Sequence, residues 1–118
     1  MIEAIARAYN IQAVFIWQPV PLYKYDLQYH PFASKTFGPQ TYSQYGYPRM
    51  RKYIDLHPCK NNFIWAADIQ ENLQQPLYVD QIHYSAEMCE LFAQHIGKEI
   101  IRRNLLALQR RARFPVTP

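Results

Sequence analysis

Two short apolar runs restrict what this chain can fold into: AVFIWQP at residues 13–19 and NFIWAAD at residues 62–68. Both are rich in β-branched and aromatic residues and end at a polar residue or proline, which is typical of a short buried β-strand. Helical spacing precedes each run, from Ile2 to Tyr9 and again over residues 47–58, where Pro48 marks the expected helix start. Because strands that alternate with helices usually lie parallel, the sequence predicts an α/β fold with parallel strands and flanking helices.

A third helix is predicted from Ser85 onward. Ser85 is the expected N-cap, and Glu87 stands in the first turn, where a carboxylate interacts favourably with the helix dipole. The apolar residues that follow recur at steps of three and four, as on one face of an amphipathic helix: Met88, Leu91, Phe92, Ile96 and Ile100.

A long tyrosine-rich segment, residues 22–47, joins the first predicted strand to the second predicted helix. Irregular connections of this length are often binding loops. We expect Trp17, Tyr23 and Tyr25 to offer an aromatic surface to a sugar or acyl group. An equally weighted alternative is that the tyrosines only anchor the loop to the protein surface.

The composition narrows the classes of partner. The 118 residues carry a formal net charge of +4, and much of the basic excess lies in residues 102–118. We interpret this basic tail as a solvated helix end rather than a nucleic-acid-binding peptide, because no aromatic residues are interleaved with its arginines. No apolar run is long enough to span a membrane, and the first ten residues lack the apolar core of a signal peptide, so the compartment stays open.

Cysteine and histidine spacing does not predict a metal site. Cys59 and Cys89 allow at most one disulfide bond and match no zinc-binding pattern, and a pairing of His30 with the HPC motif at residues 57–59 fits no known ligand spacing. We therefore expect no metal site.

The stretch YVDQIH at residues 78–83 holds the strongest chemical signal. A separation of three residues across a turn allows the Asp80 carboxylate to hold one ring nitrogen of His83 and leave the other nitrogen free as a base. Taken by spacing alone, the simpler interpretation is that Asp80 caps the turn and His83 packs on the helix start. The position after the second predicted strand favours a site, because ligands of open α/β sheets bind beyond the carboxyl ends of the strands.

With its setting, this motif resembles the C-terminal half of the SGNH (GDSL-like) hydrolases. Their D-x-x-H motif precedes a polar or small turn and a helix with an alanine ten residues after the histidine, here Asp80, His83, Ser85 and Ala93. NIQAVFIWQPVP, residues 10–21, is similar to the penultimate strand of that family and its following loop. The resemblance implies a partial flavodoxin-like three-layer fold over residues 1–101, followed by the basic tail. It also implies hydrolysis of a small-molecule or carbohydrate ester, with His83 as general base and Asp80 orienting it, and it implies no cofactor.

The chain departs from the family pattern in two respects. Met88 stands where the family usually has a glycine after the histidine, and the G-D-S serine, the oxyanion-hole glycine and the G-x-N asparagine have no counterpart here. Ser34, Ser43 and Ser85 do not follow a strand-to-turn pattern that would hold a hydroxyl on His83. We therefore expect the nucleophile to be absent from this chain.

One alternative is a non-catalytic fragment or a small binding module. Two parallel strands cannot form a viable sheet alone, because their outer edges expose unpaired backbone groups. The sequence thus also predicts self-association through an exposed sheet edge.

Overall fold

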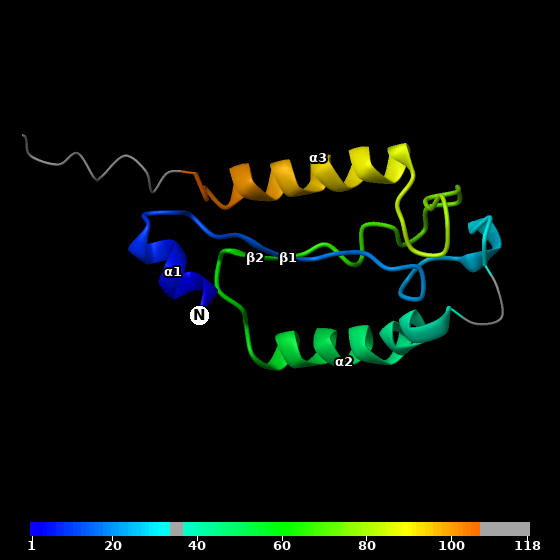
Figure 1. Cartoon of the computed structure of the whole chain (residues 1–118), viewed down its shortest axis with the longest axis horizontal. Helices are drawn as coiled ribbons and strands as arrows, with labels where there is room; N and C mark the ends of the chain where they lie inside the picture. Colours follow the sequence, from blue (N-terminus) through cyan, green and yellow to red (C-terminus); the bar gives the residue numbers. More distant parts are fainter. Residues whose placement is uncertain (34–36, 107–118) are drawn as a thin grey trace, which may run out of the picture.

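The computed structural model describes residues 1–33 and 37–106. The elements follow in the order α1 (Ile2–Ala8), β1 (Phe15–Trp17), two 3-10 helices η1 (Leu27–Tyr29) and η2 (Gly38–Tyr42), α2 (Ser43–Leu56), β2 (Phe63–Trp65) and α3 (Ala86–Arg102). The two strands run between the long helices, with α3 along one face and α2 along the other (Figure 1). This is the α/β arrangement that the alternating pattern predicts.

Strands β1 and β2 pair in parallel, as predicted. The register places Phe15 opposite Phe63 and Trp17 opposite Trp65. The Phe15 N–H donates to the Asn62 carbonyl at 2.8 Å, and the Ala66 N–H donates to the Trp17 carbonyl at 3.0 Å. These two bonds show that the backbone groups of the odd-numbered residues in β1 point toward β2.

The two faces of the strand pair pack against different helices. On the α3 face, Ile64 and Ala66 are buried with Leu105, and Phe92 and Ile100 of α3 pack against them. On the α2 face, the indoles of Trp17 and Trp65 stack with ring centroids 5.9 Å apart. This alternation follows from the two-residue period of a strand.

Helix α2 meets the strands through one aromatic contact area. The Tyr47 ring lies edge-on to Trp17 at 5.6 Å, and its hydroxyl donates to the Gln18 carbonyl at 3.0 Å. The Arg51 guanidinium lies over the Trp65 ring at 5.6 Å from the centroid, a cation–π geometry. Burial raises the pKa of Tyr47 to about 12.

The start of α2 differs from the prediction. The helix begins at Ser43, five residues before the expected start, and contains Pro48. Proline lacks the N–H that would bond the carbonyl four residues earlier, so it is tolerated best near a helix start, and here its side chain is exposed. The other end agrees with the sequence, because the helix closes before Pro58 with the His57 N–H donating to the Tyr53 carbonyl at 2.9 Å.

A second core cluster lies beyond the carboxyl ends of the strands. It contains Tyr25, Leu77, Tyr78 and Met88, all buried. Met88 lies in the first turn of α3, which Ser85 caps as predicted by accepting the Met88 N–H on its hydroxyl oxygen at 3.2 Å. Met88, which stands where the hydrolases that the motif resembles usually have a glycine, is thus a core side chain.

The two ends of the described structure differ in how far their apolar residues are buried. Helix α1 forms as predicted, yet of its residues only Ala6 is buried, and Ile2 and Ile5 are 62% and 53% exposed. After α3, Leu105 packs into the core, so the packed structure continues past residue 101. Residues 107–118 of the expected basic tail lie outside the described residues.

Within residues 1–33 and 37–106, no helix combines the length and apolarity needed to cross a membrane.

Candidate active site

A narrow hairpin between β2 and α3 carries the D-x-x-H motif. Tyr78 and Tyr84 form an antiparallel bridge, and the Val79 N–H donates to the His83 carbonyl at 2.9 Å. Asp80 and His83 therefore lie together at the tip of this hairpin.

Asp80 serves the turn and the imidazole at the same time. Its Oδ1 accepts the backbone N–H groups of Ile82 at 2.8 Å and His83 at 2.7 Å, and its Oδ2 lies 2.6 Å from Nδ1 of His83. The N–H groups of His83 and Ile82, in that order, lower the pKa of Asp80 to about 2, and the imidazole adds to the effect. One carboxylate oxygen, Oδ1, therefore caps the turn, as the simpler interpretation expects. The other, Oδ2, contacts the imidazole, as the catalytic interpretation expects.

The pair is open to solvent. The His83 side chain is 72% exposed and that of Asp80 is 51% exposed. Because Nδ1 faces the carboxylate, Nε2 is the ring nitrogen left to meet another molecule, and no bond to Nε2 is formed within the described part of the chain. The imidazole does not pack on the helix start, so this part of the simpler interpretation is wrong.

A cavity of about 370 Å³ adjoins His83. The segment after β1, the start of α2 and the hairpin form its wall. The Tyr84 hydroxyl joins the hairpin to the segment after β1 by donating to the Pro19 carbonyl at 2.6 Å. The cavity lies beyond the carboxyl end of β1, as expected for an open α/β sheet. The lining is mixed, with apolar Leu22, Phe37 and Ile82 beside polar Gln18, Gln40 and Ser43.

The sequence analysis did not identify the residue that holds the wall of the His83 cavity in place. Gln70 is fully buried, and its Nε2 donates to the carbonyls of Val20 and Tyr23, each at 2.7 Å. The Tyr78 hydroxyl donates to Gln70 Oε1 at 2.6 Å, so the amide connects the segment after β1 to the base of the hairpin. A lone glutamine in an irregular segment has no periodicity, and no sequence signal would have identified it.

The three aromatic residues proposed for substrate do not line the cavity at His83. Trp17 stacks on Trp65, and Tyr23 is buried edge-on to Trp65 at 6.0 Å. Tyr25 is also buried, and its hydroxyl donates to the Gln75 carbonyl at 3.0 Å. In this structure Trp17 packs on β2, and Tyr23 and Tyr25 pack the segment after β1 against other parts of the chain.

Neither of the described serines, Ser43 and Ser85, has its hydroxyl bonded to the His83 ring. The Ser43 hydroxyl lines the cavity but donates to the Gln40 carbonyl at 2.7 Å, and Ser85 caps α3. Ser34 falls outside the described residues. Within residues 1–33 and 37–106, no hydroxyl is hydrogen-bonded to His83.

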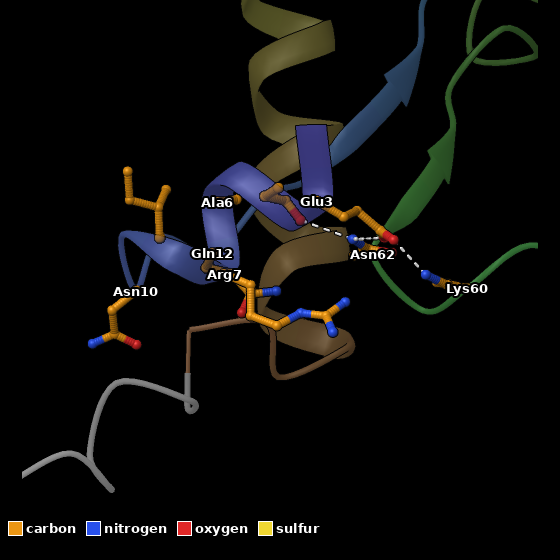
Figure 2. A pocket seen from close by; sticks show the side chains of 9 residues that line it. Glu3, Ala6, Arg7, Asn10, Gln12, Lys60 and Asn62 are labelled. Carbon is orange, nitrogen blue, oxygen red and sulfur yellow. Dashed lines mark hydrogen bonds and ion pairs between the residues drawn. The ribbon is translucent and has the colours of Figure 1, made fainter. Parts of the chain in front are cut away.

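A separate polar cavity of about 410 Å³ lies at the amino ends of the strands. Glu3 pairs there with Lys60, and Asn62 Nδ2 donates to Glu3 at 3.3 Å and to the Ala13 carbonyl at 3.0 Å, with Arg7 apart from these bonded groups (Figure 2). The Lys60 ammonium is the main cause that lowers the pKa of Glu3. Glu3 thus accepts from both Lys60 and Asn62 at the end of the sheet opposite His83.

Neither a metal centre nor a disulfide is formed by the described residues. They contain no group of three or more histidine, cysteine or acidic side chains placed to hold a metal ion. Cys59 and Cys89 are both free and exposed.

No family model matches this chain, and neither the curated proteins nor the solved structures contain a match.

Proposed function

We propose that this chain is part of an ester hydrolase of the SGNH type, on part of a flavodoxin-like fold. It supplies the general base and the aspartate that orients this base. The observation that carries the proposal is the contact of 2.6 Å between Asp80 Oδ2 and His83 Nδ1, next to a cavity beyond the carboxyl end of β1. The parallel strand pair between helical layers is compatible with that fold (Figure 1).

In this proposal, His83 is the general base. Asp80 accepts a hydrogen bond from Nδ1–H and leaves the Nε2 lone pair to take the proton of a serine hydroxyl, whose oxygen then attacks the ester carbonyl. The ionised carboxylate, whose pKa is lowered to about 2, stabilises the imidazolium that forms. The serine belongs to a polypeptide segment outside these 118 residues.

The cavity supports a substrate of modest size and mixed polarity. Its apolar residues suit a short acyl group, and the side-chain amides of Gln18 and Gln40 suit hydroxyl groups of a small alcohol or a carbohydrate. We therefore propose a short-chain ester of such an alcohol as the substrate class.

The first test is to sequence the genomic DNA that flanks the region coding for these residues. The proposal expects an in-frame strand followed by G-D-S, and a hydrolase with p-nitrophenyl acetate activity when the whole frame is expressed. Replacing His83 by alanine should then lower turnover by roughly 10²–10⁴-fold without changing the fold, because a placed general base contributes about that much. His57→Ala, at the exposed end of α2, is the matched control and should retain activity.

A second test uses the chain alone. We expect no His83-dependent turnover of p-nitrophenyl acetate and no labelling by a serine-directed phosphonate. A full-length enzyme that stays active with alanine at position 83, or a chain that labels on one of its own serines, would contradict the proposal.

A further inference from the structure

The buried imidazole of His30 packs against the hairpin that carries Asp80 and His83. His30 is 4% exposed, and its ring stacks on that of Tyr78, at the base of the hairpin, with centroids 5.1 Å apart. The ring of Phe37, which lines the cavity at His83, meets the imidazole edge-on at 5.4 Å. One side chain from the tyrosine-rich segment therefore contacts both the hairpin and the cavity wall.

The two ring nitrogens of His30 have different surroundings. Nδ1 accepts the Phe32 N–H at 3.1 Å, so in the neutral ring this nitrogen is unprotonated and the proton lies on Nε2. Nε2 is buried, and within residues 1–33 and 37–106 it forms no hydrogen bond of ordinary geometry. Since buried donors are nearly always paired in folded proteins, this N–H points to an interaction with a nearby acceptor.

The backbone carbonyl of Gln81, at the tip of the hairpin, is such an acceptor. Burial is the largest influence on the pKa of His30 and lowers it from 6.5, which keeps the ring neutral at pH 7. The Gln81 carbonyl raises this pKa, as do the carbonyl of His30 itself and the Asp80 carboxylate. Gln81 stands between Asp80 and Ile82, whose N–H donates to Asp80 Oδ1 at 2.8 Å. A group that holds the Gln81 carbonyl therefore holds the turn in which Asp80 is bonded.

We propose that His30 is a positioning residue for the Asp80–His83 pair. Its neutral ring holds the hairpin at the Tyr78 ring and at the Gln81 carbonyl, and so fixes the turn from which Asp80 reaches Nδ1 of His83. His30 does not line the cavity, so it acts through Asp80 and not on a substrate. Its importance for catalysis rests on the proposed function, whereas its effect on Asp80 is a property of this chain alone.

His30→Phe separates positioning from packing, because phenylalanine can keep the ring contacts but has no nitrogen atom. The Asp80 titration is followed in the full chain by the backbone amide signals of Ile82 and His83. Its midpoint should move from about 2 toward 3.8 in this variant, because a looser turn weakens the N–H bonds that lower the pKa of Asp80. The neutral His83 ring should also lose part of its preference for a proton on Nδ1.

His95→Phe is the matched control. His95 lies on α3, and its Nε2 is likewise buried without a bonded partner among the described residues. Its replacement removes a buried imidazole away from the hairpin and should leave the Asp80 midpoint and the His83 tautomer unchanged. Far-ultraviolet circular dichroism establishes that each variant keeps the fold.

The wild-type protein provides a readout that needs no variant. Long-range ¹H–¹⁵N correlation spectra should show the two histidines in opposite tautomers, with the proton of His30 on Nε2 and that of His83 on Nδ1. A His30 proton on Nδ1 would overturn the proposal, because Nδ1 could then not accept the Phe32 N–H and Nε2 would have no proton to offer Gln81.

Two results with the variants would also overturn it. One is a His30→Phe protein with the Asp80 midpoint and His83 tautomer of the wild type, which would show that the ring only fills space. The other is an equal shift of the Asp80 midpoint in His30→Phe and His95→Phe. None of these measurements needs turnover, so a whole frame without esterase activity would remove the proposed function and leave the expected effect of His30 on Asp80 unchanged.

Discussion

The Tyr78 hydroxyl and the Gln70 side-chain oxygen form a buried hydrogen bond of 2.6 Å that ties the hairpin base to the cavity wall. Replacing Tyr78 by phenylalanine removes the donor and leaves the amide oxygen buried without a partner. We expect a loss of about 1–3 kcal/mol in the free energy of unfolding, measured by urea denaturation. Tyr45→Phe, on an exposed tyrosine of α2, should change it little. Equal stability of the Tyr78 and Tyr45 variants would contradict the role given to this bond.

The cap of α3 should be measurable in the same way. Ser85→Ala removes the oxygen that accepts the Met88 N–H, and we expect a loss of about 1 kcal/mol. Ser85→Thr retains the hydroxyl and should restore most of the loss. If threonine is as destabilising as alanine, packing around position 85 rather than capping determines its effect.

Glu99 holds the arginine that covers the edge of β2. Hydrogen bonds from Arg102 and then Arg103 lower the pKa of Glu99 to about 2, and the Arg103 guanidinium continues to the Phe63 carbonyl. Because the folded-state pKa lies below the ordinary value of 4.5, this contribution to stability is present above pH 4.5 and is lost as the pH falls toward 2.

We expect Glu99→Gln to cost about 1–2 kcal/mol at pH 7, since the bonds are charge-assisted but partly exposed. Chemical denaturation at pH 7 and pH 2.5 measures the difference between variant and wild type. The difference should shrink at the lower pH, and a difference that is constant with pH would argue against an ionic origin.

Asp80 should titrate far below an ordinary aspartate. Its pKa is lowered from 3.8 to about 2, so the carboxylate keeps its bonds to the turn above pH 3.8 and releases them only as the pH falls toward 2. The backbone amide signals of Ile82 and His83 in nuclear magnetic resonance spectra should follow this titration, because both N–H groups donate to Asp80. A midpoint near 3.8 for these signals would show that the carboxylate is not held as described.

The sequence predicted the elements whose pattern is local. Parallel β1 and β2, helix α3 and its Ser85 cap follow from apolar spacing and capping chemistry within a few residues of each other. The start of α2 was misplaced because proline was taken as a helix boundary, although Pro48 is accommodated inside the helix.

Contacts between distant segments were beyond such reasoning. Gln70 bonds to carbonyls about fifty residues away in sequence, and Arg103 bonds to Phe63, and neither residue type predicts its partner. Likewise, the aromatic character of Tyr23 and Tyr25 does not distinguish packing from ligand binding. The Asp80–His83 contact was predictable because a turn of three residues brings both side chains together without help from the rest of the fold.

The tautomer of the neutral His83 imidazole tests the central claim most directly. Long-range ¹H–¹⁵N correlation spectra, recorded at a pH where the ring is neutral, distinguish a proton on Nδ1 from one on Nε2. Since Asp80 Oδ2 accepts from Nδ1, we expect the Nδ1–H tautomer in the wild type, with Nε2 free to act as the base, and a shift toward Nε2–H in Asp80→Asn. A wild type with its proton on Nε2, or a tautomer unchanged by Asp80→Asn, would contradict the assignment of His83 as a base oriented by Asp80.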